Sequence, residues 1–200
     1  PEFSRAALEV MRQPLEDGNV TIARAQLTLT FPARFQLVAA MNPCPCGYYG
    51  DQVKPCSCAS AAIARYRNQI SGPLLDRIDM LIHVPRVDYQ KLSSSRQGEN
   101  SAVIRERVEH ARQRQSERFA GTALFSNADM SPAELRRFCV LDAASQALMQ
   151  TAMRQLQLTA RGYHRVLKLA RTIADLADSA EITQIHLAEA LQYRAKEFEF

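Results

Sequence analysis

The chain has 200 residues, of which 46% are hydrophobic and 23% charged, with a formal net charge of +4. This composition allows one large or two small globular domains, and it excludes a disordered chain, a collagen-like repeat and a disulfide-dense miniprotein. Apolar runs stay far below the roughly 18 residues of a membrane span, and no signal peptide is recognisable, so we expect a soluble, cytoplasmic protein without membrane partners.

The first thirty residues predict a helix followed by a hairpin. Apolar residues at helical spacing over 3–17 predict one helix that ends at Gly18. Apolar and polar residues then alternate over 19–31, which is typical of two short, half-buried strands. We expect the tip of this hairpin near Arg24.

The next segments predict an α/β arrangement. The short apolar runs 35–42 and 80–84 have the character of buried parallel strands, and residues 60–70 between them have helical spacing. Strands that alternate with helices favour an α/β domain, which we expect to extend over residues 1–88.

A polar, serine-rich linker is predicted over 89–101, and residues 102–195 predict an all-α bundle. The terminal segment 196–200 breaks the helical periodicity, so we expect it to be foreign to the domain and give it no function. Helix-start signals recur along the bundle, namely a capping box at Ser131–Glu134, and caps at Asp142, Thr159 and Thr183.

Four of the five cysteines lie close together in a loop predicted over 43–59. Cys44, Cys46, Cys56 and Cys58 form two C-x-C pairs separated by nine residues. Four thiolates satisfy tetrahedral zinc, and a loop with no core of its own gains its fold from a metal. Structural zinc is the first interpretation, free thiols the second and disulfides the third. Cys139 is predicted to be a small buried apolar residue.

Asn42 stands where an α/β domain places ligands, and Arg77 and Arg161 lie in two further short strings that carry chemistry only when read together with it. Asn42 ends a predicted parallel strand, Arg77 precedes the next one, and Arg161 opens a predicted helix. Each has an ordinary structural alternative: a turn for Asn42, an ion pair with Asp76 or Asp79 for Arg77, and a solvated helix face for Arg161.

Several strings, read together, resemble a known family. In order and spacing the chain is similar to the C-terminal two thirds of magnesium-chelatase-like AAA+ ATPases, specifically the competence protein ComM (YifB) group. The resemblance covers nearly the whole chain and implies the C-terminal part of an AAA+ core followed by a helical lid. The strings that carry it are PEFS…QPLEDG at 1–18, AAMNPCPCG at 39–47, SGPLLDRID at 71–79, TARGYHR at 159–165 and ARTIADL at 170–176.

The resemblance also implies roles for particular residues. Asn42 corresponds to the sensor 1 position, and Arg77, within the segment 71–79, corresponds to an arginine finger that enters a neighbouring subunit's nucleotide site. Arg161 corresponds to the sensor 2 arginine, with Arg165 one turn later as the second candidate. The hairpin resembles an insertion that faces the pore of ring-forming relatives, which makes Arg24 a candidate DNA contact.

The function implied is that of an ATP-driven homo-oligomeric ring, expected to be a hexamer, that acts as a helicase in DNA branch migration during natural transformation and recombination. ATP and Mg²⁺ are the implied cofactors, but the sequence contains no G-x-x-x-x-G-K-[ST] phosphate loop. The phosphate loop and the Walker B carboxylates are expected upstream, so this segment alone is expected to be inactive. The alternatives are a zinc-stabilised DNA- or protein-binding module without catalytic activity, and a metal-chelatase subunit.

Overall fold

A computed structural model describes residues 1–25, 27–87, 89, 93 and 98–194. The chain divides into two compact units, Pro1–Ile78 and Asp79–Lys196. The structure is mixed α/β, with several helices and one small sheet in its described part. Most of the predicted linker 89–101 and the terminal segment 196–200 lie outside the described residues.

The predicted opening helix is present as two short ones, α1 (Arg5–Val10) and α2 (Arg12–Asp17). The break at Met11 is explained by Pro14, which has no N–H to donate to the Val10 carbonyl. The predicted end at Gly18 is confirmed. The Ser4 hydroxyl accepts from the Ala7 N–H at 3.3 Å, and Gly18 closes α2 with a left-handed φ of 63°.

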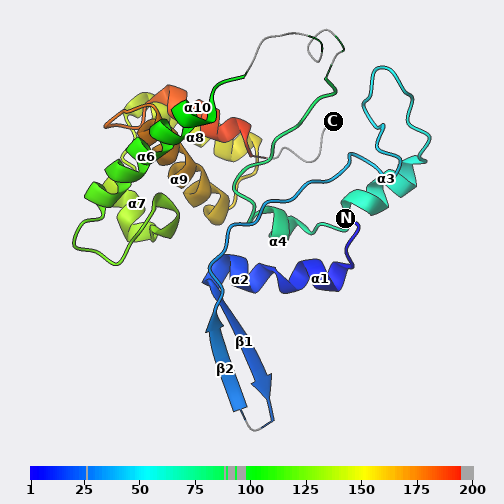
Figure 1. The fold of residues 1–200 in the computed structure, drawn as a ribbon, viewed down its shortest axis with the longest axis horizontal. Coiled ribbons are helices and arrows are strands. Elements are labelled where there is room, and N and C mark those ends of the chain that lie inside the picture. Colours follow the sequence, from blue (N-terminus) through cyan, green and yellow to red (C-terminus); the bar gives the residue numbers. More distant parts are fainter. Residues whose placement is uncertain (26, 88, 90–92, 94–97, 195–200) are drawn as a thin grey trace. The chain divides into compact units, whose positions relative to one another are not determined.

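The predicted hairpin is also present, formed by β1 (Asn19–Arg24) and β2 (Leu27–Pro32), and Figure 1 shows it as an extended two-stranded arm. The strands pair antiparallel from Asn19 opposite Pro32 to Arg24 opposite Leu27. The prediction of half-buried strands was wrong. Apolar side chains share one face, but they stay exposed, including Ile22 at 49% and Phe31 at 49%.

The partial parallel sheet predicted from 35–42 and 80–84 is not found in the described residues. Neither run forms regular secondary structure, and most of their residues are exposed, with Val38 at 84% and Ile82 at 67%. Their apolar character suits a buried strand, but a parallel strand is stable only between hydrogen-bonded neighbours and covering helices. No described segment supplies such a neighbour.

Two helices follow the cysteine loop. The first, α3 (Ser60–Arg67), lies within the predicted range 60–70 and buries Ile63. The second, α4 (Gly72–Leu75), was not predicted, because Ser71-Gly72-Pro73 has the composition of a turn. Here the same residues begin a helix: the Ser71 side chain accepts from the Leu74 N–H, and a proline is tolerated in the first turn.

The second unit is the helical bundle that the sequence predicts. Asn100 caps its first helix, and the predicted caps at Ser131, Asp142 and Thr159 each accept a backbone N–H. None of the helices in the described part combines the length and apolar character needed to cross a membrane. The helices are α6 (Ser101–Arg118), the 3-10 turn η1 (Asn127–Asp129), α7 (Pro132–Phe138), α8 (Ala143–Gln155), α9 (Ala160–Leu176) and α10 (Gln184–Gln192).

The core of this bundle is organised around α9. This helix packs against α6, α7 and α10, and Figure 1 shows them gathered about it. Val166 and Ala170 on α9 and Leu187 on α10 have no exposed surface, and Cys139 is 5% exposed, as predicted. Burial raises the pKa of the Cys139 thiol to about 11, so it stays protonated and behaves as an apolar residue.

Candidate metal centre and nucleotide-site residues

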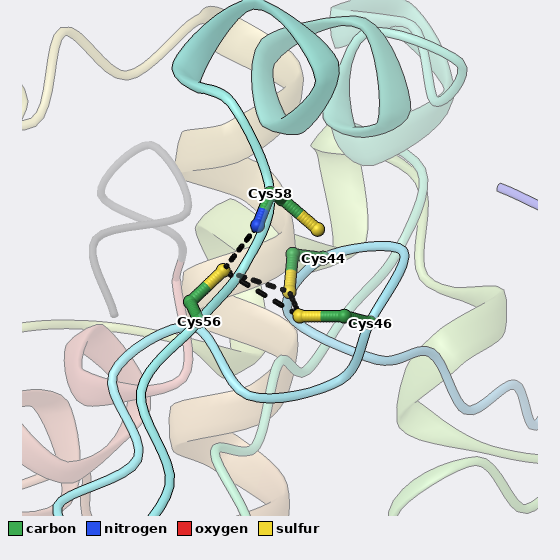
Figure 2. A group of neighbouring side chains, drawn as sticks. All are labelled: Cys44, Cys46, Cys56 and Cys58. Carbon is green, nitrogen blue, oxygen red and sulfur yellow. Dashed lines mark hydrogen bonds between the residues drawn. The ribbon is translucent and has the colours of Figure 1, made fainter.

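The four loop cysteines converge in space. Their sulfur atoms all lie within 4.8 Å of one another, and Cys44 is completely buried. The Cys44 sulfur lies 3.4 Å from that of Cys46 and 3.7 Å from that of Cys56, and the Cys46 and Cys56 sulfurs are 3.5 Å apart. Figure 2 shows the side chains pointing toward one another from two separate stretches of the loop.

Sharp local turns bring each C-x-C pair into this arrangement. Gly47 has a φ of 83°, which a residue with a side chain adopts only with strain, and its N–H donates to the Cys44 carbonyl at 3.0 Å. Further along, the Asp51 carboxylate accepts from the N–H groups of Val53 at 2.7 Å and Lys54 at 2.8 Å. These bonds turn the chain back toward the first pair.

The electrostatics of the cluster favour a shared negative charge. Backbone N–H groups of Tyr48 and Ser57 bonded to the Cys46 sulfur lower the pKa of that thiol to about 5. For Cys56 the N–H of Cys58 acts in the lowering direction, but burial and the neighbouring sulfurs outweigh it and raise the pKa to about 12. Thiolates are the form in which cysteine binds metals, and a divalent cation can take the place of the remaining protons.

Asn42 lies immediately before this cluster. A Cβ atom added at Gly47 would lie 3.9 Å from Cγ of Asn42, so the turn of the cysteine loop packs beside the amide. The Tyr66 side chain of α3 hydrogen-bonds the Asn42 backbone, and the pKa of Tyr66 is raised by burial and by the nearby Glu2 carboxylate. Asn42 therefore lies beside the loop turn and α3 while remaining exposed.

Arg77 follows α4 and is largely covered. Its side chain is 10% exposed, with Nε 3.1 Å from a carboxylate oxygen of Glu16 on α2 and Nη1 donating to the Pro73 carbonyl at 2.6 Å. An open depression of about 320 Å³ surrounds the guanidinium, and the other residues that line it are Glu9, Arg12, Gln13, Glu16 and Asp17. Glu16, which the sequence did not suggest, is thus a partner of Arg77 in the structure.

The start of the Arg77 segment is tied to α1. The Glu9 carboxylate accepts hydrogen bonds from the Ser71 hydroxyl and from Arg12, at 2.5 Å from Arg12 Nη1, and these bonds lower the pKa of Glu9. Ser71 is also the N-cap of α4. One serine thus connects the first helix of the chain to the helix that presents Arg77.

The basic residues of α9 lie in the helical unit and have different surroundings. Arg161 is exposed in the first turn, and Arg165 forms an ion pair with Asp79. Lys168 donates from Nζ to the Ala128 carbonyl at 2.7 Å, and burial, followed by the charge of Arg165, lowers its pKa. Lys168 therefore serves as a contact to η1.

Arg24 is exposed at the end of β1, opposite Leu27. The neighbouring Gln26 lies outside the described residues. The four cysteines are brought together by the structure, while the nucleotide-site residues fall in both units: Asn42 and Arg77 in Pro1–Ile78, Arg161 and Arg165 in Asp79–Lys196. Their convergence on one nucleotide stays a prediction.

A buried polar network in the helical unit was not predicted. Asp175 on α9 accepts from Arg118 at 2.8 Å and from Asn127 at 2.8 Å, and a nitrogen of Arg171 lies 3.2 Å from it. Arg171 is 3% exposed and also donates to the carbonyls of Ser179 and Ala180. The Arg-x-x-x-Asp spacing within ARTIAD was the available signal, because residues four apart share a helix face.

Two family models match successive parts of the chain. Sequence models of the magnesium chelatase subunit ChlI match residues 1–92, and those of the ChlI C-terminal region match residues 98–194. The chain belongs to the magnesium chelatase ChlI family.

Within this family, curated relatives match the chain almost from end to end. It is 46% identical over 196 residues to competence protein ComM of Haemophilus influenzae, and this match covers 98% of the chain and 37% of the relative. The protein YifB of Escherichia coli is 41% identical over 98% of the chain, and Rv2897c of Mycobacterium tuberculosis is 38% identical over 96%. The chain thus spans less than two fifths of the length of these relatives.

Proposed function

We propose that this chain is the C-terminal part of an ATP-driven ring motor that acts on DNA, of the ComM type. Membership of the magnesium chelatase ChlI family and the 46% identity to a competence protein are the observations that carry the proposal. The proposal includes three specific features, namely AAA+ chemistry, a hexameric ring and helicase-like branch migration.

In this proposal two residues of the first unit act on the phosphates. The Asn42 amide bonds the γ-phosphate or orients the attacking water, and its exposed position beside the cysteine loop and α3 is compatible with such a contact. Arg77 stabilises charge on the transferred phosphoryl group in a neighbouring subunit, an effect worth about 10³–10⁵ in rate for arginine fingers. To do so its guanidinium must exchange Glu16 for phosphate.

The helical unit contributes the nucleotide contact of the lid. Arg161 is proposed as this contact because it is exposed in the first turn of α9, and Arg165 is the second candidate. Arg165 would first have to leave Asp79. Arg24 on the exposed hairpin is proposed to contact DNA phosphates, where each contact adds salt-dependent, sequence-independent affinity.

The experiment is DNA-stimulated ATP hydrolysis by the chain extended upstream through its phosphate loop. Arg77→Ala alone is expected to lower the rate by about a thousandfold or more. Mixing it with a phosphate-loop variant should restore part of the activity, because a mixed ring contains sites with an intact loop beside an intact Arg77. Arg5→Ala, which removes an exposed arginine of α1, is the matched control and should retain activity.

Two outcomes would contradict the proposal. Full activity of Arg77→Ala would remove the finger assignment and favour a zinc-stabilised binding module without catalysis. ATP hydrolysis that is indifferent to DNA but stimulated by a porphyrin and Mg²⁺ would favour a metal-chelatase subunit. The 200-residue segment alone is expected neither to bind ATP tightly nor to hydrolyse it, and micromolar binding in a titration would refute this expectation.

A further inference from the structure

We propose that Cys44, Cys46, Cys56 and Cys58 bind one zinc ion as a closed tetrahedral site, and that this metal fixes the position of Asn42. The metal site stands independently of the proposed ATPase function. Only the consequence for Asn42 rests on that function.

The sulfur geometry is that of a metal site. Zinc–thiolate bonds of about 2.3 Å in a tetrahedron place the sulfurs about 3.8 Å apart. The three distances among Cys44, Cys46 and Cys56 are 3.4, 3.7 and 3.5 Å, and the Cys58 sulfur lies within 4.8 Å of the others. A disulfide requires about 2.05 Å, so these separations suit a shared cation and not a covalent pair.

The loop has little else to hold this arrangement. Residues 43–59 contain no helix or strand, and apart from the buried Cys44 their side chains are partly or fully exposed, with Val53 at 73%. Four converging thiols in an otherwise open loop lack the apolar burial that normally offsets the entropy of ordering a chain. Metal binding supplies that free energy in small sites of this kind.

The chemistry of the ligands sets the role of the metal. Four thiolates fill the coordination shell of zinc and leave no position for water or substrate, which is the pattern of a structural site. The resulting centre carries a net charge of −2. Two cationic side chains pack over tyrosine rings of the cysteine loop. Lys54 Nζ lies 4.1 Å from the Tyr48 ring, and the Arg67 guanidinium carbon lies 4.6 Å from the Tyr49 ring.

The site is connected to Asn42 by short links. Only Pro43 separates Asn42 from Cys44, and Arg67 Nε donates to the Pro43 carbonyl at 3.4 Å. Gly47, in the turn between the first cysteine pair and the rest of the loop, packs beside the Asn42 amide. Fixing Cys44 and Cys46 on a metal therefore fixes the backbone on which Asn42 is carried, and Asn42 is positioned by the centre without being one of its ligands.

The first test measures metal directly on the purified 200-residue chain. We expect about one zinc per chain by elemental analysis, and titration of the stripped chain with Co²⁺ should give the absorption bands of a tetrahedral tetrathiolate. Cys56→Ser should lower the zinc content at least tenfold. Cys139→Ser is the matched control, since this cysteine lies in the helical core, and it should keep one zinc.

Other results would overturn the metal site. The metal site would be refuted if the chain, purified without chelator, carried less than a tenth of an equivalent of zinc and gave no tetrahedral spectrum with Co²⁺. Disulfides among these four cysteines in the mass spectrum of the freshly purified chain would exclude it as well. The wild-type Co²⁺ titration does not depend on any variant folding.

The second test separates the role at Asn42 from the metal site. In the chain extended through its phosphate loop, removal of zinc and Asn42→Ala should each lower kcat, and zinc removal should add less than about twofold to the loss in Asn42→Ala. If instead the losses of kcat caused by zinc removal and by Asn42→Ala multiply when both are combined, the metal does not act through Asn42. That result would overturn the positioning role and leave the metal site intact. Zinc in a protein without ATPase activity would refute the proposed function alone.

Discussion

Asp175 shows how a single buried carboxylate organises the helical unit. It is 1% exposed and is bonded to Arg118 and Asn127, with Arg171 beside it. A carboxylate removed from water is stable only if its partners satisfy it, and this set of donors does so. The network joins α9 to α6 and η1, so this residue stabilises the fold of the helical unit.

Asp175→Ala should lower the free energy of unfolding by about 3–5 kcal/mol, because it leaves Arg171 and Arg118 with uncompensated charge. Urea denaturation followed by circular dichroism measures this change. Asp178→Asn is the control, since Asp178 is exposed and has a φ of 56° that asparagine tolerates. Its effect should stay below about 1 kcal/mol, and an equal effect of the two variants would contradict the assignment.

A substitution at Glu16 tests whether Arg77 needs its ion pair with Glu16 in order to act. If Arg77 works in a neighbouring subunit, Glu16 only holds it at rest, 3.1 Å away. Glu16→Gln should then keep ATPase activity within about threefold of the wild type, because the pair is partly exposed and such pairs contribute roughly 0–1 kcal/mol. Steady-state hydrolysis by the extended chain is the measurement. A loss as large as that of Arg77→Ala would mean that Arg77 acts through Glu16.

At the scale of elements, helix caps set the limits of the bundle. Asp142 accepts the Ser145 N–H at 2.7 Å and begins α8, and Glu134 completes the capping box of α7. Backbone N–H bonding from Ser145 lowers the pKa of Asp142, and the Ser131 hydroxyl lowers that of Glu134. Both carboxylates therefore bind protons more weakly in the folded than in the unfolded chain.

This difference makes the stability of the bundle depend on pH in a defined direction. The contribution of Asp142 is fully present above its unfolded pKa, near 3.8, and is lost as the pH falls through its lowered folded pKa. Asp142→Asn keeps an N-cap acceptor but does not titrate. The variant should show a smaller fall in urea midpoint between pH 5 and pH 2.5 than the wild type. Parallel falls would exclude a contribution from this cap.

The elements also show what the sequence predicts well. The starts of α8 and α9 were predicted to within one residue from Asp142 and Thr159, because helix-start signals are local. The runs 35–42 and 80–84 were predicted as parallel strands and are not strands in the structure, because a parallel strand depends on partners distant in sequence. The four cysteines were predicted as one site from spacing alone, whereas the Glu16 partner of Arg77 had no signal in the spacing.

At the scale of the whole molecule, the two units differ in how they are stabilised. The apolar core cluster lies entirely within residues 119–193, and among the described residues of Pro1–Ile78 only Cys44, Ile63 and Leu74 are buried apolar residues. Hydrophobic burial is the main favourable contribution to folding. The helical unit therefore has its own source of stability, while the first unit buries few apolar residues.

The segment Asp79–Lys196, expressed alone, should consequently fold and unfold cooperatively, with a thermal midpoint within a few degrees of the corresponding transition in the whole chain. Calorimetry of both measures this. Leu187→Ala, which empties a fully buried position on α10, should lower the free energy of unfolding by about 2–5 kcal/mol in either context. Because the core does not draw on residues 1–78, the two losses should agree within about 0.5 kcal/mol. A segment that melts without cooperativity, or a variant whose cost differs between the two contexts, would show that the first unit contributes to the core of the second.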